Sequence, residues 1–104
     1  MDIKEALAHI EIHHVLSVYA RGVDRADLET LSSVYHPDGT DDHGSFNGLG
    51  TAFAQQLIND EKGMTAVGQH HITNVVIQMD GEDNARVESY FLAFHPHEDT
   101  GSLK

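Results

Sequence analysis

An aspartate and a histidine far apart in the sequence have the side chains needed to move a proton without a cofactor. Asp24 closes a helical run that includes Tyr19, and His70 opens a strand-like run that continues to Ile77. A carboxylate that binds one imidazole nitrogen orients the ring, and the other nitrogen can then act as a general base. Spacing alone leaves another interpretation open, in which Asp24 caps the helix that starts near Asp27 and His70 is a structural strand histidine.

Two further side chains could assist proton transfer if the fold brings them into one pocket with Asp24 and His70. Tyr19 lies near the end of the first predicted helix, where its phenol could donate to a departing oxygen or to a carbonyl. It could equally be a core aromatic residue whose hydroxyl is bonded elsewhere. His95 shares a strand face with Phe91 and Ala93, so it could be an inward-facing acid or only the last residue of a strand.

The other histidine and acid clusters do not predict a metal site. His9 and His13 are four residues apart on a helix, a spacing that can chelate a metal, but acids at Asp2 and Glu5 border that side and favour a solvated surface. The Asp-Asp-His run at residues 41–43 lacks the ligand order of a calcium loop and is interpreted as a polar edge or turn. The chain has no Cys, which excludes Cys-ligated metals. We therefore predict neither a metal nor a cofactor.

The length and composition predict one ordinary globular domain. The chain has 104 residues, of which 39% are hydrophobic and 22% are charged, and this length has room for one modest core. A formal charge of −11 repels nucleic acids and anionic membranes. The N-terminus is charged, and no apolar run reaches membrane-spanning length. We expect no nucleic-acid or membrane partner and a cytoplasmic location.

The hydrophobic pattern predicts helices first and strands afterwards. A helix from Ile3 to about Arg21 should become more buried toward its end and stop at Gly22. A second helix should carry Leu28, Leu31, Val34 and Tyr35 up to Pro37, and a third should begin with Thr51 as its cap. The segment 38–48 is rich in turn residues and has room for one short, irregular strand.

After the third helix the period of the pattern changes to that of a β-hairpin. Residues 70–79 and 85–95 are two strand-like runs, joined by a turn segment at 80–84. Strict alternation would place His70, Ile72, Asn74 and Val76 on one face of the first strand. Helices followed by antiparallel strands predict the α+β class.

The order of these motifs resembles the SnoaL-like family of the nuclear transport factor 2-like superfamily. The resemblance covers nearly the whole chain and depends on the order of the motifs. In sequence order these are Tyr19-Ala-Arg-Gly-Val-Asp24, Asp27-Leu-Glu-Thr-Leu31, Tyr35-His-Pro-Asp-Gly39, His70-His-Ile-Thr-Asn74, and the turn from Asp80 to Val87.

The resemblance implies a cone-shaped α+β barrel in which helices pack on a curved, mainly antiparallel sheet around a deep apolar pocket. Relatives include polyketide cyclases, scytalone dehydratase, a hexachlorocyclohexane dehydrochlorinase and bile-acid 7α-dehydratase. The positions of Asp24 and His70 match their Asp–His pair, Tyr19 matches a tyrosine of the bile-acid enzyme, and His95 lies near a second histidine of scytalone dehydratase. The two strands that normally close the barrel have no counterpart here, which predicts a single domain over 1–104 that is incomplete at its C-terminal end.

The sequence thus predicts a cofactor-independent lyase or isomerase that acts on a small hydrophobic, cyclic molecule. His70, held by Asp24, would take a proton from carbon, and Tyr19 and His95 would assist the leaving oxygen or an enolate. The alternative is a non-catalytic ligand-binding or assembly module, comparable with the β subunit of aromatic-ring dioxygenases, because fold does not fix function. An open sheet with two apolar faces also predicts a homodimer or higher homo-oligomer.

Overall fold

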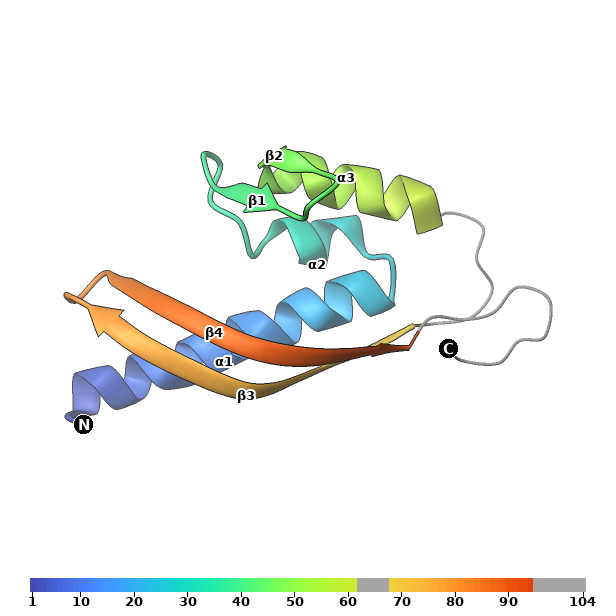
Figure 1. The fold of residues 1–104 in the computed structure, drawn as a ribbon. Coiled ribbons are helices and arrows are strands. Elements are labelled where there is room, and N and C mark those ends of the chain that lie inside the picture. Colours follow the sequence, from blue (N-terminus) through green and yellow to red (C-terminus); the bar gives the residue numbers. More distant parts are fainter. Residues whose placement is uncertain (62–67, 95–104) are drawn as a thin grey trace.

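A computed structural model describes residues 1–61 and 68–94 of the chain. Within these residues, three helices and four strands follow one another in the order α1 (Ile3–Asp24), α2 (Leu28–Ser32), β1 (Thr40–Asp42), β2 (Asn47–Leu49), α3 (Gly50–Glu61), β3 (Gln69–Asp80) and β4 (Asn84–Phe94) (Figure 1). The two long antiparallel strands follow the helices, which confirms the α+β class.

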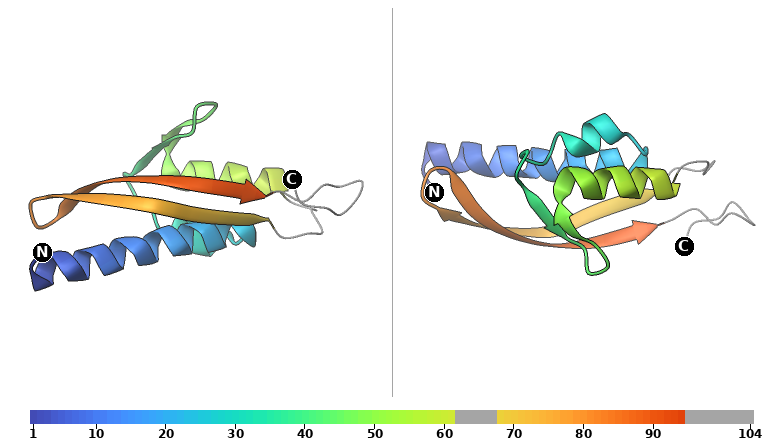
Figure 2. Two further views of the ribbon diagram at one scale, coloured as in Figure 1. Left: turned by 60° about the horizontal axis from the view of Figure 1, so that its bottom comes forward. Right: turned by 90° about the horizontal axis from the view of Figure 1, so that it is seen from above.

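The strands form two separate antiparallel sheets. In the short hairpin Thr40 pairs with Leu49, and in the long hairpin the pairs run from Gln69 opposite Phe94 to Asp80 opposite Asn84. Helix α1 runs along one face of the long hairpin (Figure 2). Helix α2 packs against α1, α3 packs against α2, and the short hairpin packs against α3. The described strands therefore leave the cone-shaped barrel open.

A small core lies where the C-terminal half of α1 meets α2 and α3. Its buried members are Val23, Leu31, Phe53 and Ala54, with Tyr35 and other partly buried side chains packed against them. The first half of α1 is exposed by comparison, so the prediction that this helix becomes more buried toward its end is confirmed. No helix in residues 1–61 is long and apolar enough to cross a membrane.

Helix α1 does not stop at Gly22, and this correction matters for the position of Asp24. The helix continues to Asp24, and the left-handed residue after it is Ala26, with φ of 50°. Asp27 N–H donates to the Gly22 carbonyl and Ala26 N–H to the Val23 carbonyl, the two bonds of a Schellman motif. Gly22 is needed for another reason, because a Cβ there would lie 2.8 Å from Leu31 Cα.

Three local predictions were also imprecise. Helix α2 ends at Ser32, and Val34 and Tyr35 follow it in a turn. One short strand was expected in the segment 38–48, but two strands form there, and the second of them ends one residue later, at Leu49. Thr51 lies inside α3, which begins at Gly50; the helix starts directly after β2, so a cap at Thr51 has no place in it.

We predict that substitutions of two small residues near the end of α1 have opposite effects on stability, because Gly22 allows a close contact with α2 and Ala26 ends the helix. Gly22→Ala should lower the free energy of unfolding by about 1–3 kcal/mol, because the added methyl overlaps the backbone of α2. Ala26→Gly should raise it by up to about 1 kcal/mol, because glycine tolerates positive φ. Urea denaturation measures both; a destabilising Ala26→Gly would contradict this account of the turn.

We also propose that a second copy of the chain covers the outer face of the long hairpin. This face, on the side of His71 and Phe94, exposes Val76, Tyr90 and Leu92. Light scattering should give at least twice the 11.5 kDa mass of one chain, and Leu92→Glu should shift it toward the monomer. Gln78→Glu on the same face is the matched charge control, and a monodisperse monomer of the unaltered chain would contradict the proposal.

Candidate active site

Asp24 and His70 are in direct contact, although 46 positions separate them in the sequence. Asp24 Oδ1 lies 2.6 Å from His70 Nδ1, and the backbone N–H of His70 donates to Asp24 Oδ2 at 3.1 Å. The two side chains are 19% and 14% exposed, respectively. One carboxylate thus fixes both the backbone and the ring of the same histidine.

This contact sets the orientation of the imidazole. An ionised carboxylate only accepts hydrogen bonds, so the 2.6 Å contact places the proton of neutral His70 on Nδ1. Nε2, at the other edge of the ring, then carries the lone pair. The arrangement is that of a general base with its orienting carboxylate.

The alternative role of Asp24 as a helix cap belongs to Asp27. Asp27 Oδ1 accepts from Thr30 N–H at 3.2 Å, and Asp27 Oδ2 accepts from the Thr30 hydroxyl at 2.7 Å. The hydrogen bond from the Thr30 side chain lowers the pKa of Asp27, because it favours the ionised form. Asp27 therefore begins α2 and leaves Asp24 to bind His70.

A β-bulge decides which side chains of β3 share a face with His70. Thr73 pairs with Tyr90 and Val76 with Glu88, so Asn74 and Val75 lie opposite Ser89 alone. Asn74 has a φ of 54°, a conformation that asparagine adopts more readily than most residues.

The extra residue corrects the predicted alternation of this strand. His70 and Ile72 are partly buried before the bulge, and Val75, Ile77 and Met79 are partly buried after it. Asn74 and Val76, which strict alternation would place with His70, are exposed. The bulge lets one strand present His70 to the cavity that α3 also lines and, farther along, Met79 to a groove lined by α1.

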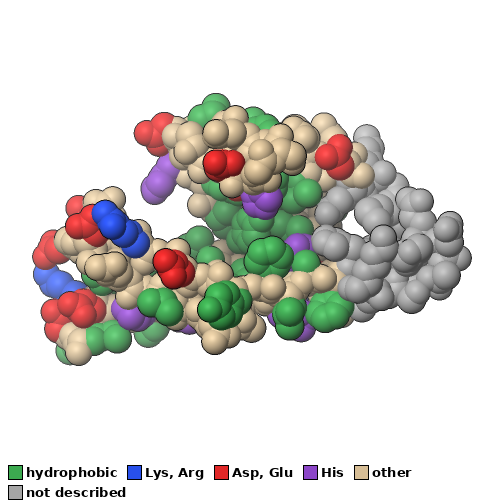
Figure 3. All heavy atoms as spheres, in the orientation of Figure 1, with side chains coloured by type: hydrophobic (Ala, Val, Ile, Leu, Met, Phe, Trp, Pro, Cys, Tyr) green, Lys and Arg blue, Asp and Glu red, His purple; other side chains and the backbone are tan. Residues whose placement is uncertain are grey.

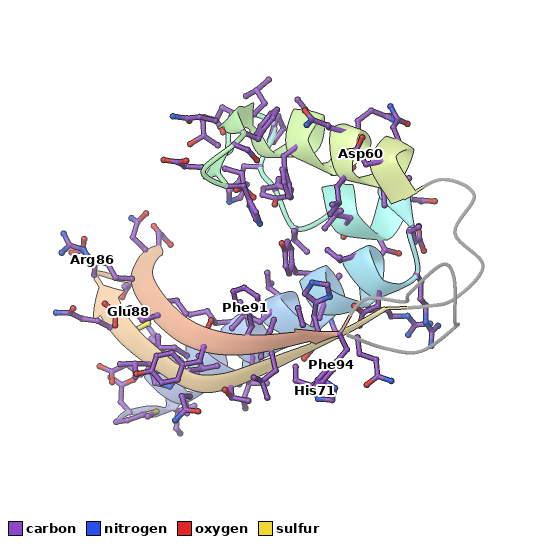
Figure 4. The ribbon with its side chains drawn as sticks, turned by 45° about the vertical axis from the view of Figure 1, so that its right-hand side comes forward. Asp60, His71, Arg86, Glu88, Phe91 and Phe94 are labelled. Atoms are coloured by element: carbon purple, nitrogen blue, oxygen red, sulfur yellow. The ribbon has the colours of Figure 1, made fainter. Side chains whose placement is uncertain are left out.

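His70 lines a cavity of about 330 Å³ between the long hairpin and the lobe formed by α3 and the short hairpin. Apolar side chains form much of its wall, and polar ones also reach it, among them Gln56 and Asp60 of α3. Figure 3 shows hydrophobic side chains gathered behind the hollow between the two parts. In Figure 4, Phe91 projects from β4 toward the helices, whereas His71 and Phe94 project from the opposite face.

The other predicted site residues have different outcomes. Tyr19 lines the same cavity as His70 and also packs against the core. Its position therefore agrees with both alternatives, the phenol at the pocket and the aromatic residue of the core. His95 lies outside the described residues. Within the described ranges, no group of three or more acidic or histidine side chains could hold a metal ion.

Sequence reasoning missed a second carboxylate–imidazole pair at this cavity. His43 Nδ1 lies 2.7 Å from Asp41 Oδ1, and the Tyr35 hydroxyl donates to Asp41 Oδ2 at 2.5 Å. His43 lines the cavity that His70 also lines. The signal was the two-residue spacing of Asp41 and His43 at the end of a strand, which places both on one side; the turn-like composition hid it.

The environment of Tyr35 keeps its proton on the phenol. Burial raises the pKa of Tyr35 strongly, and the hydrogen bond and negative charge of Asp41 raise it further. Tyr35 also packs so closely against Gly50 that a Cβ at position 50 would overlap its ring. The phenol is therefore a fixed donor to Asp41.

Comparisons with known proteins agree with the predicted family. A family model described as SnoaL-like domain matches residues 4–104. The crystal structure of a protein provisionally assigned as a scytalone dehydratase, from Novosphingobium aromaticivorans, superposes with a TM-score of 0.79 at 21% sequence identity. The alignment covers 91% of this chain and 64% of that chain, so the present chain spans less than two thirds of it. No curated protein matches the sequence.

We predict that the site depends on the left-handed conformation of Asn74. Asn74→Val should lower the free energy of unfolding by about 1–2 kcal/mol, because a β-branched residue is strained at positive φ. Asn74→Gly should be close to neutral. Thermal or urea denaturation measures the difference, with Thr73→Val as the control at an adjacent exposed position; equal stability of the Val and Gly variants would contradict the strained bulge.

Proposed function

Because this chain belongs to the SnoaL-like domain family, we propose that it is a cofactor-independent lyase or isomerase acting on a small hydrophobic, cyclic molecule. One observation carries the proposal: the 2.6 Å contact between Asp24 and His70 at the wall of a cavity. A base oriented in this way can remove a proton from carbon without a metal or an organic cofactor.

In the proposed mechanism, His70 Nε2 accepts the proton of a carbon–hydrogen bond. The imidazolium that forms is stabilised by Asp24, which stays ionised and keeps the ring in place. Tyr19, on the same cavity, donates to the oxygen that gains negative charge, whether it departs or becomes an enolate. His95, outside the described residues, remains a predicted assisting acid.

The cavity wall supports the proposed substrate class. Phe46, Phe53, Leu57 and Phe91 contribute to it, and a volume of about 330 Å³ lies at the small end of the range for ligand sites. Aromatic side chains in the wall suit a flat ring, and half of the lining residues are polar, which suits a ring that also carries oxygens. The dehydratase assignment of the structural neighbour also agrees with an elimination.

The test uses a nitrobenzisoxazole, a small bicyclic compound that opens when a base removes its ring proton and releases a coloured cyanophenolate. We expect the unaltered chain to open it faster than free imidazole does. His70→Ala should reduce the rate about 100-fold, the order of general-base contributions. Asp24→Asn should reduce it about tenfold, because the amide lacks the negative charge that stabilises the imidazolium. Absorbance measures the phenolate directly.

The matched control is His71→Ala. His71 adjoins His70 but lies on the outer face, where its Nε2 is hydrogen-bonded to Gln69 Oε1 and its ring contacts Phe94 edge-on. Its removal changes the histidine content equally and should leave the rate unchanged. If His70→Ala and His71→Ala open the compound at the same rate as the unaltered chain, His70 is not the base and the proposed mechanism is wrong.

A non-catalytic assembly module is the second candidate, favoured by the apolar side chains exposed on the outer face of the long hairpin. The same experiment separates the two functions. If the chain is a catalyst, His70→Ala lowers its rate and leaves its mass in solution unchanged. If it is only an assembly module, the unaltered chain has no rate above that of free imidazole, although Leu92→Glu still weakens its association.

A further inference from the structure

We propose that His43, oriented by Asp41, is a second acid–base residue of this cavity and donates a proton to the oxygen that leaves the substrate. The inference rests on the proposed function, in which His70 takes the proton from carbon. It assigns delivery of the proton to the short hairpin, on the far wall of the cavity, and leaves Tyr19 a hydrogen bond that stabilises negative charge on the same oxygen.

The position of His43 is fixed by three contacts. Its Nδ1 lies 2.7 Å from Asp41 Oδ1. Its ring stacks on Phe53, with 4.2 Å between the ring centroids and 18° between the planes. Its backbone N–H donates to the Phe46 carbonyl at 2.7 Å. The first two contacts fix the ring of His43, and the third fixes the backbone of the turn that carries it.

The exposure of the pair suits an acid. Asp41 is 13% exposed, whereas His43 is 47% exposed. The carboxylate is thus shielded, while the ring it holds reaches the cavity and water. A carboxylate at Nδ1 stabilises the imidazolium, and the proton on Nε2, at the other edge of the ring, is then available to a bound molecule.

Tyr35 extends this arrangement into the core. Its hydroxyl donates to Asp41 Oδ2, while Oδ1 of the same carboxylate faces His43. Tyr35 also packs against the core formed by Val23, Leu31 and Ala54. The chain Tyr35–Asp41–His43 therefore connects the imidazole to rigid structure, and Asp41 and Tyr35 act as positioning residues.

The two imidazoles approach one cavity from different elements. His70 comes from β3, and His43 comes from the turn between β1 and β2, which lies across the hollow from the long hairpin. Phe91 is near His70, at 6.4 Å between ring centroids, and Phe53 stacks on His43. A molecule that fills this cavity therefore meets both imidazoles, because both line it.

The proposed elimination balances with these two groups. His70 takes a proton from carbon, and the electrons of that bond form the new π bond. The bond to the leaving oxygen breaks, and the oxygen keeps its electron pair and takes the proton of protonated His43. His70 finishes protonated and His43 neutral, and exchange of one proton with water at each ring restores the starting state.

The test varies the leaving group. The nitrobenzisoxazole releases a weakly basic phenolate that needs little help from an acid, whereas the unsubstituted benzisoxazole releases a more basic one. His43→Phe keeps a ring that can stack on Phe53 and removes the donor. It should slow the unsubstituted compound at least tenfold more than the nitro compound, the order expected for loss of a hydrogen bond to developing charge.

Two pairs of variants distinguish loss of the proton donor at His43 from damage to the structure of the turn. His43→Gln, which retains a donor, should recover part of the rate. Asp41→Asn should show the same leaving-group dependence as His43→Phe, whereas Asp42→Asn, at the adjacent carboxylate that accepts from Gly44 N–H, should not. Tyr35→Phe should give a smaller effect of the same kind. His70→Ala should slow both compounds by the same factor, because it removes the base.

A second measurement is independent of turnover. The released cyanonitrophenolate should bind the unaltered chain in an absorbance titration, and His43→Phe should weaken its binding about tenfold, whereas Asp42→Asn should not. This decides the role of His43 even if no turnover is detected.

The outcomes distinguish the two proposals. If His70→Ala has no effect on either compound, the proposed function fails, and the titration alone decides whether His43 binds the oxygen. If His70→Ala abolishes turnover while His43→Phe slows both compounds equally, or neither, and binds the phenolate normally, this inference is wrong and the proposed function stands.

Discussion

Both carboxylate oxygens of Asp24 bind one residue, and this contact joins the end of α1 to the start of β3. The helix end must therefore be placed accurately. Gly22 allows α2 to pass within van der Waals distance of α1, and the Schellman motif at Ala26 turns the chain directly after Asp24. If α1 had ended at Gly22, Asp24 would lie outside the helix, without the backbone bonds that fix its direction.

The sequence predicted the elements of this arrangement better than their exact junctions. The helical spacing of α1 and the long hairpin followed from periodicity. The pairing of Asp24 with His70 was implied by the resemblance to the SnoaL-like family, since spacing alone left it open. The role of Gly22 could not be predicted, because a glycine near a helix end can either end the helix or allow another backbone to approach closely. Local sequence favours the stop; only the packing of Leu31 decides for the contact.

The bulge at Asn74 was hidden for a similar reason. Alternation assumes that each residue of one strand faces one residue of the other strand. The sequence Thr73-Asn74-Val75-Val76 is compatible with a regular strand and with a bulged one. Packing against α1 favours the bulge, because it turns Val75 and Ile77 inward while His70 stays on the same face. The second pair, Asp41 and His43, was missed because short strands within a polar segment have little periodicity to detect.

The two carboxylate–imidazole pairs differ in a way that follows from where each is built. His70 lies on a strand covered by the end of α1 and is shielded from water together with Asp24. His43 lies on a tight turn, so its carboxylate is shielded but its ring is not. In the proposed reaction this difference matters, because a base shielded from water is less solvated and therefore more reactive toward a carbon acid. An acid in contact with water recovers its proton between turnovers without a dedicated pathway. The end of a helix and a short hairpin thus give two chemically similar pairs different surroundings, and these match the proposed roles of His70 in removing a proton and of His43 in delivering one.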